Sequence, residues 1–261
     1  MIRSLWRYRS FVLGMARREF QARYRGSVLG SLWAVLNPLT MVFIYTVVFG
    51  HVMRNRVPGV DDALGYGLFL SAGLFTWATF TEVFQRSVSI FVEQANLLKK
   101  VSFPRASLPA IVVTSSVMHF AIVFAILVAM LLAARRFPGA AIACFLPLVA
   151  LQLAIAVGLG VGLGVMNVFF RDVAQVVAIG LQLWFWFTPI IYPVEALGER
   201  ARSVVSLNPM TAIARGYQDI VLHGRCPDPL SLLPQVAFAA AALAFAWAAL
   251  RRWGGEMVDE L

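Results

Sequence analysis

Aromatic and amide side chains recur on one side of an apolar stretch in the second half of the chain, VVAIGLQLWFWFTPIIYP. The residues at spacings of seven, four and three positions, which share one face of a helix, are Gln175, Gln182, Trp186 and Pro189. Aromatic rings offer stacking surfaces to sugars, and a buried glutamine offers a donor and an acceptor. This face therefore favours a passage for a polar polymer. Aromatic residues near the end of a membrane helix are more often headgroup anchors, an alternative that explains Tyr192 well and Gln182 poorly.

A second polar face lies in the first apolar stretch, SLWAVLNPLTMVFIY. Pro38 removes a backbone donor and usually kinks a helix, and irregular backbone inside a membrane needs protein or water beside it. Trp33, Asn37 and Thr40 lie on one side of this helix. We expect them to face a cavity and to line a translocation pathway. A structural kink, with Asn37 bonded to a neighbouring helix, is an equally open alternative.

No sequence pattern supports catalysis. The chain lacks the GxxxxGK[ST] phosphate loop, the HExxH zinc motif and paired His and Cys ligands, and its three histidines are scattered. We predict no catalytic residue, no metal site and no cofactor bound by this chain. The segment GLGVGLG lies inside an apolar stretch, so Gly160 and Gly164 are interpreted as positions of close helix packing.

The composition requires a membrane around these elements. The 261-residue chain is 60% hydrophobic and only 13% charged, whereas a soluble domain has about 25% charged residues. The net charge of +9 and the isoelectric point near 10.4 fit anionic lipid headgroups better than nucleic acid, because too little polar surface remains for a soluble DNA-binding fold. We predict an all-α integral membrane protein with one domain over residues 1–261.

Six stretches reach the roughly 20 apolar residues that a membrane-spanning helix needs. They run over residues 32–52, 63–83, 106–133, 141–169, 173–192 and 230–250, and a tail follows at 251–261. If both termini are cytoplasmic, 14 of the 22 Lys and Arg lie on the inner side and eight on the outer side, which fits the positive-inside rule. Arg135 and Arg136 in an outer loop weaken this bias.

The segment before the first span combines arginines with an apolar side. Because the arginines at positions 3, 7, 17 and 18 share one sector of a helical wheel, we predict an amphipathic helix within residues 1–30, lying on the cytoplasmic membrane surface. The residues expected to meet lipid headgroups or a diphosphate are Arg17, Arg18, Arg23 and Arg25. An ordinary basic flank is the alternative, and it does not explain the confinement to one face. The short apolar core FVLGMA, followed at once by arginines, predicts no cleavable signal.

The loop between the second and third spans is the most polar cytoplasmic segment. SIFVEQANLLKK has helical periodicity and holds the only two lysines of the chain, so it predicts a short surface helix that docks on another protein. The residues proposed for this contact are Phe91, Glu93, Gln94, Leu97, Lys99 and Lys100. A simple connecting loop remains an alternative.

The segment at 193–229 is long for a connection without function. It is too interrupted to span, so we predict two re-entrant helices on the outer side, divided near SLNP, with the second at 212–222. Asn208 and Pro209 at this division are candidates for an outer gate. Cys144 lies in an apolar stretch and Cys226 in a polar loop, and we expect two free thiols.

Three segments carry a family resemblance. They are RREFQARYRGSVLGSLWAVLNPL at 17–39, FFRDVAQVV at 169–177 and SLNPMTAIARGYQDIVL at 206–222. In this order and spacing they resemble the transmembrane subunit of type-2 ATP-binding-cassette exporters, in the branch that exports O-antigen, capsule or teichoic-acid polymers across the bacterial cytoplasmic membrane.

The resemblance implies the partners of this chain. ATP and Mg²⁺ would be bound by two separate nucleotide-binding subunits, which the interfacial helix and the loop around residues 93–100 would contact. Two copies of the chain would pair as a homodimer, with spans one and five lining a pore for a lipid-linked glycan. The segment at 193–222 would close the outer end of that pore.

Three other functions remain as alternatives. An exporter of drugs or other small hydrophobic molecules would share this architecture but predicts fewer aromatic and amide groups than Trp186 and Gln182 represent. An ion-coupled transporter normally buries charges at mid-membrane, and Glu82 lies near the inner end of its span. An enzyme acting on lipid-linked sugars needs acid, base or metal groups clustered at one membrane surface.

Overall fold

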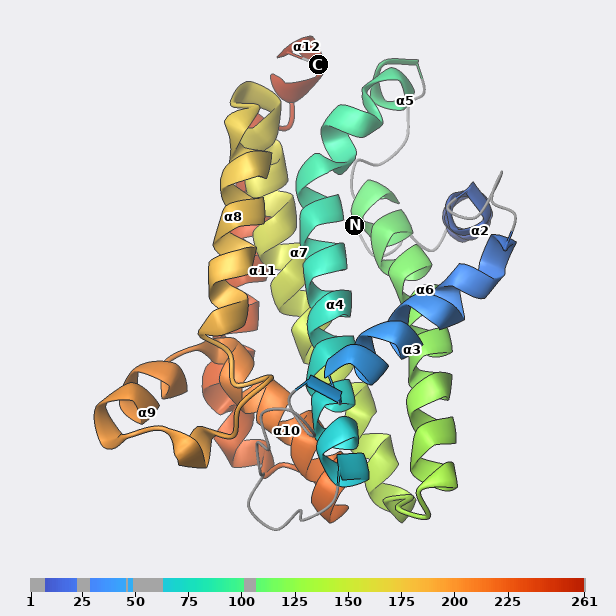
Figure 1. Ribbon diagram of the computed structural model, residues 1–261. Helices are drawn as coiled ribbons and strands as arrows, with labels where there is room; N and C mark the ends of the chain where they lie inside the picture. Colours follow the sequence, from blue (N-terminus) through green and yellow to red (C-terminus); the bar gives the residue numbers. More distant parts are fainter. Residues whose placement is uncertain (1–7, 23–28, 46, 49–62, 101–106, 261) are drawn as a thin grey trace.

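The computed structural model describes residues 8–22, 29–45, 47–48, 63–100 and 107–260, and these residues form helices and connecting turns without a β-strand. The helices are α2 (Arg9–Ala22), α3 (Trp33–Tyr45), α4 (Ala63–Glu93), α5 (Ala95–Lys100), α6 (Ser107–Ala133), α7 (Phe145–Phe169), α8 (Asp172–Trp186), α9 (Glu199–Ser206), α10 (Pro209–His223), α11 (Leu233–Trp253) and α12 (Met257–Glu260). Short 3₁₀ helices are η1 (Gly30–Leu32), η3 (Gly139–Cys144), η4 (Val194–Ala196) and η5 (Pro229–Leu232). In Figure 1 the long helices run side by side, with α5 and α12 at one end of the bundle and α10 at the other.

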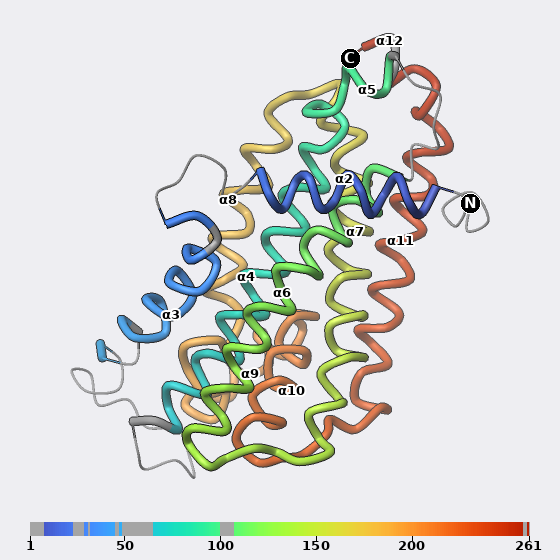
Figure 2. Tube along the Cα trace, turned by 90° about the vertical axis from the view of Figure 1, so that its right-hand side faces the viewer, coloured from blue at the N-terminus to red at the C-terminus, as the bar shows by residue number. Residues whose placement is uncertain are grey.

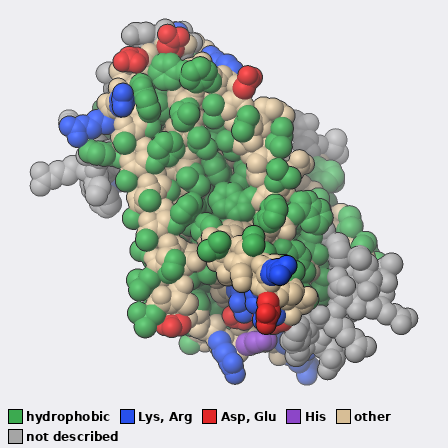
Figure 3. Space-filling view, turned by 90° about the vertical axis from the view of Figure 1, so that its left-hand side faces the viewer, with side chains coloured by type: hydrophobic (Ala, Val, Ile, Leu, Met, Phe, Trp, Pro, Cys, Tyr) green, Lys and Arg blue, Asp and Glu red, His purple; other side chains and the backbone are tan. Residues whose placement is uncertain are grey.

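Four stretches of the described chain are long and apolar enough to cross a membrane. They are Gly65–Glu93, Ser107–Ala133, Gly139–Phe169 and Pro229–Trp253, and they match the predicted second, third, fourth and sixth spans. Figure 3 shows hydrophobic side chains over the middle of the face that carries α8 and α9, with charged groups gathered toward its two ends. This distribution fits a protein surrounded by lipid.

The predicted first and fifth spans correspond to shorter apolar helices, α3 and α8. α8 has 15 residues and is about 22 Å long, less than the roughly 30 Å of a hydrocarbon core. It ends at Trp186 rather than at residue 192, because Pro189 has no amide hydrogen to continue the helix and the chain turns there. α3 passes through Pro38 as far as Tyr45, and residues 49–52 of the predicted first span lie outside the described residues. A count of six spans remains a prediction.

α7 lies between α4 and α11 and uses glycines on both sides. A Cβ at Gly164 would lie 2.5 Å from the Ser87 carbonyl oxygen of α4, and one at Gly160 would lie 2.6 Å from Ser87 Cβ. The predicted close packing at these two glycines is therefore confirmed. The alternate glycines, Gly158 and Gly162, face Ala242 and the Phe245 ring of α11, so a second close contact went unpredicted.

α2 lies across the bundle rather than along it. Figure 2 shows α2 running across α6 near the end of the bundle that carries α5 and α12. Val12 and Ala16 are buried, whereas Arg17 and Arg18 are exposed. This is the two-sided helix that the sequence predicts. Arg3 and Arg7, on which the prediction also rested, lie outside the described residues, as do Arg23 and Arg25.

Two helices, α9 and α10, occupy the segment between α8 and α11, as predicted. Asn208 caps α10, since its Oδ1 accepts a hydrogen bond from the Met210 amide at 2.9 Å. Pro209 occupies the first turn of α10, where a backbone amide has no partner within the helix and its absence costs nothing. Their division at Leu207 and Asn208 agrees with the predicted division at SLNP. Whether these helices dip into the membrane remains a prediction.

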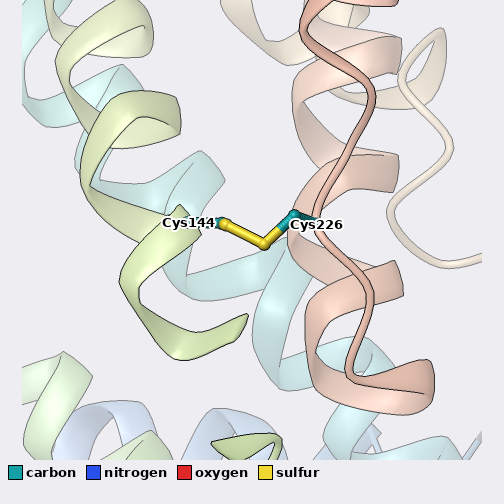
Figure 4. Close-up of a disulfide and its surroundings, with 2 residues drawn as sticks. All are labelled: Cys144 and Cys226. Carbon is teal, nitrogen blue, oxygen red and sulfur yellow. A yellow bond between two sulfur atoms is a disulfide. The ribbon is translucent and has the colours of Figure 1, made fainter. Parts of the chain in front are cut away.

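The expectation of two free thiols is wrong. Cys144 and Cys226 form a disulfide with Cα atoms 5.7 Å apart and 82 residues apart in sequence, and Figure 4 shows it joining the start of α7 to the chain after α10. The packing of α10 against α7 brings these two places together. In the sequence, Cys144 lies in an apolar stretch and Cys226 in a polar loop, and neither feature indicates that α10 packs against α7.

Candidate functional site

The predicted polar face of α8 is present in part. Gln175, Gln182 and Trp186 are all exposed on α8, and Trp186 is 63% exposed. Pro189 does not share this face, because it follows the end of the helix and is buried, with its carbonyl oxygen accepting a hydrogen bond from Gln218 Nε2 at 3.0 Å. The exposed neighbours on α8 are large and apolar, namely Val176, Ile179 and Leu183. The amides and the indole therefore stand on an otherwise apolar surface.

A cavity of about 640 Å³ lies between α4, α8 and α9. Its lining residues are mostly apolar and are Phe84, Val177, Gly180, Leu181, Trp184, Phe187, Val204, Leu207, Asn208 and Pro209. The two predicted gate residues, Asn208 and Pro209, thus lie at the edge of a cavity beside α8. Their role as a gate remains a prediction.

Asn208 connects the end of α8 to the start of α10. Its Oδ1 accepts a hydrogen bond from Trp184 Nε1 at 2.7 Å, and its Nδ2 donates to the Phe187 carbonyl at 3.0 Å and to Thr188 Oγ1 at 2.9 Å. Sequence reasoning identified Asn208 but missed Trp184. The spacing of 24 residues between them gives no signal, because the path of the chain through residues 187–207 brings the two side chains together.

A second cavity, of about 610 Å³, is lined by residues of α3, α4, α6 and α8; we call it the α3 cavity. Its polar and aromatic lining residues include Trp33, Asn37, Trp77, Thr79, Thr81, Glu82 and His119. Trp33 and Asn37 therefore lie beside a cavity, as expected. Thr40 is not among the lining residues and is exposed, and its Oγ1 donates to the Leu36 carbonyl at 2.8 Å.

The predicted coupling segment forms the end of α4 and the short helix α5. Glu93 and Lys99 are exposed and Gln94 and Leu97 are half-buried, while the side chain of Lys100 lies outside the description. Phe91 is fully buried, so it packs inside the bundle and does not face a partner. α12 lies beside α5 (Figures 1 and 2), so part of the tail contacts the coupling segment, and the sequence did not indicate this contact.

A cluster of charged side chains lies at the end of the bundle that carries α10. Arg215 Nη2 donates to Glu195 Oε1 at 2.9 Å, and both lie beside Asp219 and His223 around one small cavity. Burial raises the pKa of the Asp219 carboxyl above its ordinary value of 3.8, and Glu195 adds to this effect, whereas His223, Arg215 and Arg225 oppose it. In the described chain, no three His, Cys, Asp or Glu side chains come close enough to hold a metal ion.

The comparison with known proteins identifies the family. The family model described as ABC-2 type transporter matches residues 11–222 of this chain. The chain belongs to the ABC-2 transporter family. This ABC-2 protein is 34% identical to the O-antigen export system permease protein RfbA of Myxococcus xanthus, over 95% of this chain and 93% of the relative.

Two further relatives extend the comparison. A protein of the same name from Klebsiella pneumoniae is 30% identical over 80% of this chain and 79% of its own length. The polysialic acid transport protein KpsM of Escherichia coli is 23% identical over 82% of each chain. The ABC-2 protein thus resembles permeases of two kinds of polysaccharide over most of its length.

Proposed function

We propose that this chain is the membrane-spanning permease subunit of an ATP-driven exporter that moves a lipid-linked surface polysaccharide, such as an O-antigen or a capsule, across the bacterial inner membrane. The observation that carries this proposal is the similarity to O-antigen export permeases over almost the full length of both chains. The similarity to a polysialic acid transport protein supports a polysaccharide over a small hydrophobic molecule.

The passage is formed in this proposal by two copies of the chain. The α8 face with Gln182 and Trp186, and the α3 side with Trp33 and Asn37, carry the aromatic and amide groups that suit a sugar chain. A glycan needs many weak contacts of this kind, because it must slide past each one. The exposed apolar surface of α8 is where the second copy packs.

The energy comes from two nucleotide-binding subunits that hold ATP and Mg²⁺. The end of the bundle with α5 and α12 is their contact surface, with Glu93 and Lys99 exposed on it. α2 lies on the membrane surface at the same end, and its exposed Arg17 and Arg18 contact lipid headgroups or the substrate diphosphate.

The orientation follows from charge and from the disulfide. Disulfides persist in oxidising compartments such as the bacterial periplasm, so the end with Cys144 and Cys226 faces outward and the opposite end, with α5 and α12, faces the cytoplasm. Both termini are cytoplasmic in this orientation. Arg135 and Arg136 then lie on the outer side, against the positive-inside rule. The disulfide is the stronger evidence for orientation, because disulfides persist in the periplasm and not in the cytoplasm.

The proposal is tested with the purified complex of this chain and its nucleotide-binding partner in proteoliposomes. Lipid-linked glycan from the native host is expected to stimulate ATP hydrolysis and to appear on the opposite side of the membrane, and a partner that binds but cannot hydrolyse ATP is the control. Stimulation by small hydrophobic drugs, with no response to the glycan, would contradict the proposal.

A further inference from the structure

One arginine inside the bundle connects three helices. Arg86 of α4 donates through Nη2 to Glu19 Oε1 of α2, and through Nη1 to Glu82 Oε1 one turn earlier on α4, at 3.4 Å. The same Nη1 lies 3.3 Å from Ser115 Oγ and 3.4 Å from Ser116 Oγ of α6. We call these five residues the Arg86 network.

The network is largely shielded from the surroundings. Side-chain exposure is 18% for Arg86 and 19% for Glu82, and both serines are buried. A charge in such a place is costly when one of its partners leaves, because little water reaches it to replace that partner. Any movement that separates Glu19 from Arg86 therefore changes the interactions of Arg86 with Glu82, Ser115 and Ser116.

The attachment of α2 to this network rests on one carboxylate oxygen. Glu19 Oε1 accepts from Arg86, whereas its Oε2 is buried and has no hydrogen-bond partner among the described residues. Elsewhere on α2, the small and apolar side chains of Val12 and Ala16 are buried against the bundle. Glu19 is thus a side chain through which a displacement of α2 changes the charges inside the bundle.

Glu82 links the Arg86 network to the α3 cavity. It accepts from Ser116 Oγ at 3.1 Å within the network, and it also lines the α3 cavity together with Trp33 and Asn37. A continuous chain of polar contacts therefore runs from α2 on the surface, through Arg86, to a cavity beside the proposed passage.

We propose that the Arg86 network couples the position of α2 to the shape of the α3 cavity. When the nucleotide-binding subunits displace α2, Glu19 leaves Arg86, and Arg86 then pairs with Glu82 alone. The Glu82 carboxylate turns toward Arg86 and away from the cavity. Because coupling is reciprocal, an occupant of the cavity that binds Glu82 also shifts α2. Arg86 and Glu19 are positioning residues that act through Glu82. The inference rests on the proposed function, since that function supplies the movement of α2.

The first test compares the number of ATP molecules hydrolysed per glycan exported in proteoliposomes. Glu19→Gln keeps the size of the side chain and removes its charge, and it is expected to leave basal ATP hydrolysis unchanged while raising this ratio clearly above the wild-type value. Glu19→Asp, which keeps the charge, should restore part of the coupling. The matched control is Gln85→Ala, an exposed neighbour of Arg86 on α4, which should match the wild type.

A double variant separates coupling from simple stability. If Glu19 acts through Arg86, Glu19→Gln combined with Arg86→Gln changes the ratio no more than Arg86→Gln does alone. The proposal would be overturned if the double variant multiplied the effects of the two single variants on the number of ATP molecules hydrolysed per glycan. It would also be overturned if Glu19→Gln kept the wild-type value of this ratio. If Arg86→Gln does not accumulate, Glu19→Gln carries the test by itself.

A second measurement needs no transported substrate. A spin label at Ala78, an exposed position on the edge of the α3 cavity, is expected to change its mobility when ATP binds to the complex, and to lose that response in Glu19→Gln. An unaltered response in the variant overturns the coupling. A wild-type complex that moves no glycan but keeps the label response contradicts the proposed function and leaves the coupling supported.

Discussion

A methyl group added at Gly164 is expected to force α7 and α4 apart. Its Cβ would lie 2.5 Å from the Ser87 carbonyl oxygen and 3.2 Å from the Val88 carbonyl oxygen, against about 3.4 Å for an ordinary contact. Both atoms belong to the α4 backbone, so no side chain can turn away and the helices must separate by roughly 1 Å. Overpacking of this kind costs about 1 to 3 kcal/mol.

Two other glycines make this prediction specific. At Gly162 the new Cβ meets the Phe245 ring at 2.2 Å, a side chain that can rotate, so Gly162→Ala should cost less than Gly164→Ala. At Gly180 of α8 nothing lies within 4 Å, so Gly180→Ala should be neutral or stabilising by up to about 1 kcal/mol, since alanine favours a helix over glycine.

The assay is thermal unfolding of the three purified variants in one detergent. Gly164→Ala is expected to lower Tm by about 2 to 12 °C, at roughly 2 to 4 °C per kcal/mol, and Gly180→Ala to leave it unchanged or raise it. If Gly164→Ala unfolds at the same temperature as Gly180→Ala, the account of α7 packing is refuted.

Three further predictions concern the end of the bundle that carries α9 and α10. The thiols of Cys144 and Cys226 should react with a maleimide only after reduction, and Cys144→Ser should lose about 2 to 4 kcal/mol of stability; labelling without reductant would contradict the disulfide. Asn208→Ala should cost about 1 to 3 kcal/mol, because it removes the α10 cap and leaves Trp184 Nε1 without its acceptor, and thermal unfolding equal to wild type would refute this. Burial raises the pKa of Asp219 in the folded state, so the folded protein binds the proton more tightly than the unfolded chain does. The stability that this group contributes is therefore greatest below pH 3.8 and falls as pH rises through the folded pKa. Asp219→Asn should lack that fall, and identical profiles of unfolding temperature against pH for the variant and the wild type would contradict this prediction.

The sequence predicted those features that depend on local pattern. Hydrophobic length identified the four long spans, the glycine pair at 160 and 164 indicated a close helix contact, and the interruption at SLNP indicated the division between α9 and α10. Each of these signals lies within one helix or at one boundary. Periodicity and capping preferences act over such short distances.

Features that depend on contacts between distant segments were missed. The Cys144–Cys226 disulfide requires α10 to pack on α7, and the Arg86 network joins Glu19 to an arginine 67 positions later. Pro189 was placed on a helical face by counting residues, although the same proline ends the regularity on which the counting relied. Phe91 was assigned to a docking surface because it is an apolar residue of the periodic segment SIFVEQANLLKK, and only the packing of α4 shows that it is buried.

The most direct test of glycan export is deletion of the gene in its native host, followed by analysis of surface and cytoplasmic glycans by gel electrophoresis and mass spectrometry. A plasmid copy of the gene is the control. The account predicts that a polymer accumulates inside the cell, disappears from the surface and returns to the surface with the plasmid. Unchanged surface and cytoplasmic glycans, in a strain that expresses no second exporter, would contradict it.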